Sequence, residues 1–152
     1  MVDKELSEEE EMHKKIAINL FNSTWGLMEK KDRTKEVDDE MINSAHASRF
    51  HWGKVGAPVN FLRGEWLISR VYSILKRAEP SIYHAQRCLD ICLEHKIGDY
   101  DLAWAYEALA RAYSVKGDKI KTEEYMKIAK EASEKIAKKE DKDLLFKELG
   151  TI

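Results

Sequence analysis

The sequence has few of the residues that cross-link a chain or interrupt a helix. It contains two cysteines and two prolines in 152 residues. Both cysteines fall in one expected helix, which argues against a disulfide framework and favours a reducing compartment. Pro58 and Pro80 stand at expected helix starts, where a missing N–H does no harm. The prolines therefore mark helix boundaries and break no helix interior.

Long apolar runs and an excess of one charge are also missing. No apolar run approaches the roughly 20 residues of a membrane-spanning helix. The acidic first segment, MVDKELSEEEEMHKK, lacks the apolar core of a signal peptide. The 26 Lys+Arg and 28 Asp+Glu leave a formal charge of -2, so no basic field indicates nucleic-acid binding. We expect a cytoplasmic protein that binds neither a membrane nor nucleic acid.

The motifs of common catalytic and cofactor sites are absent as well. The sequence has no Gly-rich phosphate loop, nucleophile elbow, HExxH or CxxC. We therefore expect no cofactor, and a binding protein is favoured over an enzyme.

Helical periodicity is what the sequence does contain, and it predicts one all-α domain over 1–152, with residues 1–7 frayed. Ser7 and Glu10 form a capping box, and Thr34 can cap the second helix. Short loops favour antiparallel neighbours, so we expect stacked helix pairs followed by a short C-terminal helix. The expected helices cover about 8–31, 37–55, 58–77, 81–96, 102–116, 119–138 and 143–149.

The stretch 61–77, FLRGEWLISRVYSILKR, is apolar around most of a helix circumference. A helix with so little polar surface normally lies between other helices, so we expect it at the centre of the stack. Its remaining polar strip consists of Arg63, Trp66, Arg70, Ser73 and Arg77.

An internal repeat supports this architecture. Arg70-Val-Tyr-Ser recurs 41 residues later as Arg111-Ala-Tyr-Ser. The second copy, AYEALARAYSVKGDKIKTEEYMKIAKEA, resembles a tetratricopeptide repeat, although Thr122 stands where that family usually has alanine. The first copy has four more residues, which we place in its inter-helix turn. The chain is also similar to a group of bacterial proteins of unassigned function that share the pattern AHASRxHW…GEW…AYEALAR.

The resemblance implies that the first helix of each pair lines a concave surface. In that register Trp104, Glu107 and Arg111 face the groove, and the positions 41 residues earlier reproduce the polar strip of 61–77. The position 41 residues before Trp66 is Trp25, in the first expected helix. Arginines suit carboxylates and phosphates, so we predict a groove for an anionic peptide or small molecule. The predicted ligand-binding residues are Arg49, Arg63, Trp66, Arg70, Trp104, Glu107 and Arg111. The alternative is an ordinary i,i+4 pair of Glu107 with Arg111, and tryptophans that belong to the core.

Glu65 falls on the apolar face of the central helix, where a carboxylate needs a partner. Arg49 and His84 are the expected partners, in a buried ion pair that fixes helix register. The functional alternative is an enzyme in which Glu65 and His46 join these two residues in acid–base or metal-assisted chemistry, with Glu65, His46 and His84 as the catalytic candidates. A third alternative is a homodimer formed through the exposed edge of the stack.

We predict no metal site. His46 and His51 are five residues apart, about 140° around a helix, whereas helical ligand pairs use i,i+3 or i,i+4. His84 and His95 share a face with Cys88 and Cys92 but lie about 16 Å apart along the axis. The cysteines are expected to act as small buried apolar residues.

Overall fold

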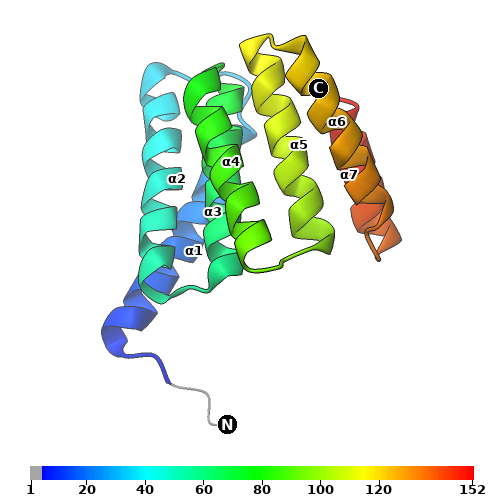
Figure 1. The fold of residues 1–152 in the computed structure, drawn as a ribbon. Helices are drawn as coiled ribbons and strands as arrows, with labels where there is room; N and C mark the ends of the chain where they lie inside the picture. The colour runs from blue at the N-terminus through cyan, green and yellow to red at the C-terminus, as the bar shows by residue number, and fades with distance from the viewer. Residues whose placement is uncertain (1–4) are drawn as a thin grey trace.

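Residues 5–152 are described in a computed structural model, and this part of the chain consists of seven α-helices (Figure 1). The predicted all-α fold, six helices and a short last one, is confirmed. Residues 1–4 of the segment expected to fray lie outside the described residues. No helix within 5–152 is both long enough and apolar enough to cross a membrane. The helices are α1 (Glu8–Met28), α2 (Lys35–Val55), α3 (Pro58–Ile74), α4 (Ala78–Glu94), α5 (Asp99–Lys116), α6 (Lys119–Glu134) and α7 (Lys139–Leu149).

Successive helices pack as the antiparallel pairs α1/α2, α3/α4 and α5/α6 (Figure 1). The first helices of the pairs also touch one another, because α3 contacts both α1 and α5. The last helix, α7, packs against α5 and α6. The inner row α1–α3–α5, with α7 beyond it, therefore forms one side of the molecule.

Two of the predicted helix starts are confirmed. The backbone N–H of Glu10 donates to Ser7 Oγ at 3.1 Å, and the Ser7 N–H donates to Glu10 Oε1 at 3.2 Å. The N–H of Val37 donates to Thr34 Oγ1 at 3.3 Å. Each bond satisfies a backbone donor that the helix leaves free in its first turn.

The predicted end of the central helix is wrong by three residues, since α3 stops at Ile74. Lys76 has a left-handed backbone, with φ of 61°, and the Arg77 N–H donates to the Tyr72 carbonyl at 2.9 Å. This is the usual way to close a helix, but glycine normally occupies the left-handed position. Because this position holds a lysine and not a glycine, the sequence did not indicate that the helix ends here.

The fourth helix starts earlier than predicted. Helix α4 begins at Ala78 and includes Pro80 in its first turn. Proline is tolerated there, since that N–H has no partner within the helix. The connection from α3 to α4 is only 75–77, against 117–118 between α5 and α6. The turn of the first copy is therefore one residue longer, and not four longer as expected, and the extra residues belong mainly to the start of α4.

The last two helices differ from the prediction as well. Helix α6 ends at Glu134 and not near residue 138, and residues 139–142, which fell between the last two expected helices, begin α7. Glu140 and Asp141 lie in the first turn of α7, where carboxylates interact favourably with the helix dipole. Charge alone therefore did not distinguish a loop from a helix start.

Two core clusters meet at α3. One joins it to α1 and α2 through Leu67, Ile68 and Val71, and the other joins it to α4 and α5 through Leu62. A third cluster holds α7 on α5 and α6 through the buried Leu145. The expectation that this helix lies at the centre of the stack is confirmed.

Replacing Leu67 by alanine should lower the free energy of unfolding by about 2–5 kcal/mol, because the side chain is 0% exposed and the α1–α2–α3 cluster cannot refill its volume. Leu93→Ala is the matched control, since that leucine is 57% exposed. Urea unfolding followed by circular dichroism measures both. Equal effects of the two substitutions would contradict the central position of α3.

Candidate ligand-binding pocket

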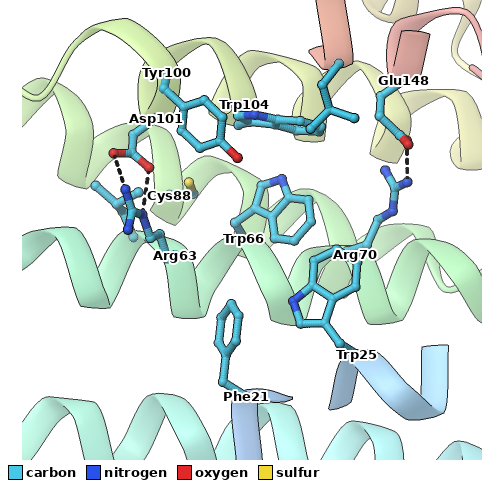
Figure 2. Close-up of a pocket in the computed structure, with 12 residues that line it drawn as sticks. Phe21, Trp25, Arg63, Trp66, Arg70, Cys88, Tyr100, Asp101, Trp104 and Glu148 are labelled. Atoms are coloured by element: carbon cyan, nitrogen blue, oxygen red, sulfur yellow. Dashed lines mark hydrogen bonds and ion pairs between the residues drawn. The ribbon is translucent and has the colours of Figure 1, made fainter. Parts of the chain in front are cut away.

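A cavity of about 520 Å³ opens on the side formed by α1, α3, α5 and α7 (Figure 2). We call it the tryptophan pocket. Its volume lies within the range of small-molecule sites. The residues that line it are Phe21, Trp25, Leu62, Arg63, Trp66, Arg70, Cys88, Tyr100, Asp101, Trp104, Leu144 and Glu148.

Three tryptophans, one from each helix of the inner row, form most of the aromatic wall. The Trp25 and Trp66 rings stack with centroids 5.7 Å apart and planes 26° apart. The Trp66 and Trp104 rings meet edge to face, with centroids 5.7 Å apart and an angle of 83°. Tyr100 adds an edge contact to Trp104 at 6.0 Å. The predicted gathering of these tryptophans is confirmed, and their role in binding stays a prediction.

Trp66 is held by its neighbours in a defined orientation. Its Nε1 is buried and has no hydrogen-bond partner among residues 5–152. Figure 2 shows the nitrogen-bearing edge of Trp66 facing Trp104. An N–H directed at an aromatic face makes only a weak interaction. The indole is therefore positioned mainly by ring packing.

Arg63 lies at one end of the pocket and is paired within the protein. Its Nε donates to Asp101 Oδ1 at 3.0 Å and its Nη2 to Asp101 Oδ2 at 3.1 Å. The hydrogen bond to Asp101 raises the pKa of Arg63 above its ordinary value. Half of the Arg63 side chain stays exposed. This two-pronged pair already fills the position that we predicted for an anionic ligand.

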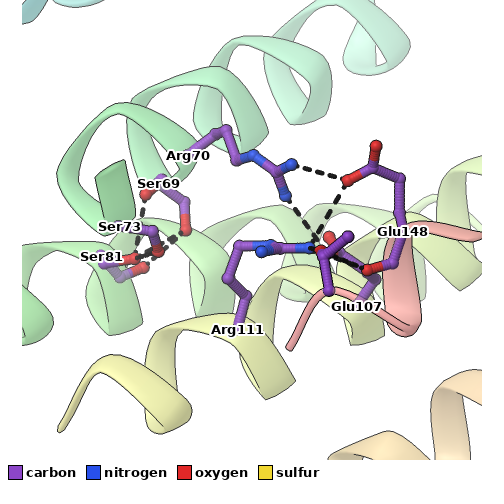
Figure 3. Close-up of polar contacts among 8 residues, drawn as sticks. Ser69, Arg70, Ser73, Ser81, Glu107, Arg111 and Glu148 are labelled. Carbon is purple, nitrogen blue, oxygen red and sulfur yellow. Dashed lines mark hydrogen bonds and ion pairs between the residues drawn. The ribbon is translucent and has the colours of Figure 1, made fainter. Parts of the chain in front are cut away.

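Arg70 lies at the other end and joins α3 to α5 and α7 (Figure 3). Its Nη2 donates to Glu148 Oε2 at 2.7 Å, and its Nη1 donates to Glu107 Oε1 at 3.3 Å. Glu148 belongs to the last helix, which the repeat register does not include. The second predicted anion-binding arginine is thus also paired.

Glu107 and Arg111 form the predicted i,i+4 pair, with Nε to Oε1 at 2.8 Å. Arg111 Nη2 also donates to the carbonyl oxygen of Glu148 at 3.1 Å and to Thr151 Oγ1 at 2.7 Å. Neither Glu107 nor Arg111 lines the tryptophan pocket. Both lie outside this pocket, because α7 and the residues after it cover this end, and their role in binding stays a prediction.

Burial and the neighbouring arginines shift the pKa of Glu107 in opposite directions. Its side chain is 0% exposed, and its Oε2 has no hydrogen-bond partner among the described residues. Burial raises the pKa of Glu107 above its ordinary value, although Arg111 and Arg70 act to lower it. The carboxylate is tolerated there because two guanidinium groups lie against it.

Sequence reasoning missed four pocket residues that matter to its chemistry: Tyr100, Asp101, Leu144 and Glu148. Tyr100 precedes the register position of Trp104 by four residues, one helical turn, and that spacing could have identified it. Nothing in the sequence shows that α7 packs beside the pocket.

A separate polar centre surrounds Glu65 on the other side of α3. Arg49 Nε donates to Glu65 Oε1 at 3.3 Å, and His84 Nδ1 lies 2.6 Å from Glu65 Oε2. Both predicted partners are confirmed. Burial alone would raise the pKa of Glu65, but the hydrogen bond and charge of His84, with those of Arg49, hold it below its ordinary value.

The close approach of Arg49 to Glu65 depends on Gly64. A Cβ at Gly64 would lie 2.7 Å from the Cδ of Arg49, closer than such atoms approach. The Arg49 guanidinium also lies over the Phe61 ring, with Cζ 4.7 Å from the ring centroid. Arg49 is therefore held against α3 and does not line the tryptophan pocket.

His46 completes the polar centre without reaching Glu65 directly. Its Nε2 lies 2.9 Å from the Tyr72 hydroxyl, and its ring centroid is 5.3 Å from that of His84. Burial lowers the pKa of His46, and nearby His84 lowers it further against the opposing charge of Glu65. None of the four residues proposed for acid–base chemistry lines the tryptophan pocket. Each is held by a neighbouring side chain, as expected for a structural network.

Within the described residues, no three His, Cys, Asp or Glu side chains are grouped so that they could hold a metal ion. His51 contacts His13 of α1, with the two Nδ1 atoms 2.8 Å apart. Cys88 and Cys92 are free and buried in the core cluster of α3, α4 and α5. The expectation that the cysteines act as buried apolar residues is confirmed.

The comparisons with known proteins do not assign this fold or site to a family: no family model matches the chain, and neither the curated proteins nor the solved structures provide a match. The resemblance to tetratricopeptide repeats therefore stays a prediction. The pocket must be interpreted from its own chemistry.

The stability of the protein should fall as the pH decreases below 6.5, partly through His46. Because its folded-state pKa is lowered from 6.5, the unfolded chain binds more protons in this range. The stability that neutral His46 contributes is fully present above pH 6.5 and is lost as the pH falls below that value. His46→Gln should reduce the difference in unfolding free energy between pH 7.5 and pH 5.5, measured by urea unfolding. Some dependence should remain, since burial also lowers the pKa of His51.

His95→Gln is the control for this experiment, because the His95 side chain is 43% exposed. A pH dependence that His46→Gln leaves unchanged would contradict the role given to His46.

Glu107→Ala should lower the free energy of unfolding by about 3–5 kcal/mol, because Arg70 and Arg111 would share only the Glu148 carboxylate. Glu94→Ala is the control, since that side chain is 73% exposed and should cost no more than about 0.5 kcal/mol. Thermal and urea unfolding measure both. A loss below 1 kcal/mol for Glu107→Ala would show that the arginines need no second carboxylate.

Proposed function

We propose that this chain is a non-catalytic binding protein that holds a small organic molecule in the tryptophan pocket. The observation that carries the proposal is the cavity of about 520 Å³ with aromatic walls from several helices. Pockets of this size with mostly apolar linings and a few polar groups are typical of ligand sites. The three tryptophans supply large, rigid contact surfaces.

The shape of the site favours a small molecule over an extended peptide. Leu144 and Glu148 of α7 form one wall, and Thr151 beyond them binds Arg111. An extended peptide would need a groove continuing along α5 past this point. Residues of α7 and Thr151 occupy the space along α5 beyond the pocket. We therefore propose a ligand that does not extend past the wall formed by Leu144 and Glu148.

The helices act as a rigid scaffold that positions the pocket residues. We propose that α3–α6 are two degenerate repeats of the tetratricopeptide type, in a cytoplasmic protein. We propose a small-molecule partner for this pocket, with neither nucleic acid nor a membrane as the partner, and the pocket lining supports this with residues of several helices of one chain. We assign the cluster of Glu65, Arg49, His84 and His46 the structural role of fixing α2 and α4 on α3.

Trp25→Ala should weaken ligand binding about 30-fold without unfolding the protein. Trp25 is 38% exposed and stacks on Trp66, so its loss removes a pocket wall and little core packing. Truncating an aromatic anchor typically costs about 2 kcal/mol, which corresponds to this factor. The probe is N-phenyl-1-naphthylamine, an uncharged dye that fluoresces in apolar sites. Native mass spectrometry of the purified protein would search for a retained molecule in parallel.

The matched control is Phe50→Ala, which removes an aromatic ring that is 59% exposed and does not line the pocket. Binding of the dye should be unchanged in this variant. If Trp25→Ala and Trp104→Ala both bind the dye as the unsubstituted protein does, the pocket is not the binding site.

A further inference from the structure

The charges in the tryptophan pocket are balanced before any ligand enters. Its lining holds two arginines, Arg63 and Arg70, and two carboxylates, Asp101 and Glu148. Each arginine is bonded to one of these carboxylates, at 3.0 and 3.1 Å for Arg63 and 2.7 Å for Arg70. An anionic ligand would have to displace a carboxylate that is already well placed. A charged ligand therefore gains little from these arginines.

The aromatic walls do not favour a cation either. Arg70 already lies near the Trp66 ring, with Cζ 6.0 Å from the ring centroid. A cationic ligand on Trp66 would compete with this guanidinium and be repelled by it. The stacked Trp25 and the perpendicular Trp104 instead present flat apolar surfaces in two orientations. Such walls match a flat ring system.

Tyr100 supplies an uncharged polar group in the same lining. Figure 2 shows its hydroxyl directed into the space between Trp104 and Trp66. Burial, followed by the nearby Asp141, raises the pKa of Tyr100, so the hydroxyl stays protonated at neutral pH. It can donate a hydrogen bond to a carbonyl or ring nitrogen.

We propose that the ligand of the tryptophan pocket is an uncharged, flat ring compound with a hydrogen-bond acceptor that meets the Tyr100 hydroxyl. This inference rests on the proposed function, since it specifies the ligand of the same site. It replaces the anion expected from the sequence with a neutral ligand, because α5 and α7 each supply a carboxylate to the arginines.

Four probes with one ring system test the inference: 2-acetylnaphthalene, 2-methylnaphthalene, 2-naphthoate and 2-naphthyltrimethylammonium. They carry, in that order, a neutral acceptor, no polar group, a negative charge and a positive charge. Displacement of N-phenyl-1-naphthylamine from the full chain measures their affinities. We expect 2-acetylnaphthalene to bind at least tenfold more tightly than either charged probe. It should bind about fivefold more tightly than 2-methylnaphthalene, the gain of one hydrogen bond.

Two variants locate the effect. Tyr100→Phe should remove the preference for 2-acetylnaphthalene over 2-methylnaphthalene, because only the hydroxyl is lost. Asp101→Asn should raise the affinity for 2-naphthoate about tenfold, because Arg63 loses the charge that compensates it. Circular dichroism confirms the fold of each variant, and either one alone tests its own part of the inference.

The outcomes separate the two proposals. If 2-naphthoate or the ammonium probe binds most tightly, the neutral-ligand inference is overturned and the proposed function stands. An unchanged probe preference in Tyr100→Phe, or an unchanged 2-naphthoate affinity in Asp101→Asn, overturns the inference in the same way. If neither the dye nor any of the four probes binds, the proposed function fails, and the inference fails with it.

Discussion

The structure depends on α3 being packed between two layers of helices while carrying polar side chains that must be satisfied. A buried charged group without a partner costs several kcal/mol, and each charged side chain of α3 binds a group from another helix. Ser69 Oγ donates to the Ser81 carbonyl at 2.8 Å, which joins α3 to α4 (Figure 3). Glu65 binds α2 and α4, Arg63 binds α5, and Arg70 binds α5 and α7. These pairs set the positions of the surrounding helices.

The same pairing shapes the chemistry of the pocket. The arginines that the repeat register directs to the concave side are the ones that hold α5 and α7 in place. Their charge is therefore used for assembly, and the tryptophans remain as the surfaces available to a ligand. In this fold the aromatic walls and the ion pairs have separate tasks: contact with the ligand, and closure of the two ends of the pocket.

Much of the fold and part of the site could be predicted, since both follow from short-range patterns. The caps at Ser7 and Thr34 and the burial of α3 depend on residues within one or two turns of a helix. The partners of Glu65 were predictable because few cations faced it. The helix end before Lys76 was missed, since a lysine and not a glycine takes the left-handed position there. Local sequence thus identified which elements form, with errors at their ends.

The sequence by itself determined the helices, their buried faces and the polar groups that needed partners, because periodicity and the cost of desolvation act on each residue where it stands. Only the tertiary structure decided which partners they found. Asp101 is 38 residues from Arg63, and Glu148 is 78 residues from Arg70. No periodic pattern connects such distant positions. The Arg63–Asp101 contact depends on how α5 packs on α3, and the Arg70–Glu148 contact depends on how α7 packs on α5 and α6. Together these contacts turn a predicted anion groove into a pocket with balanced charges.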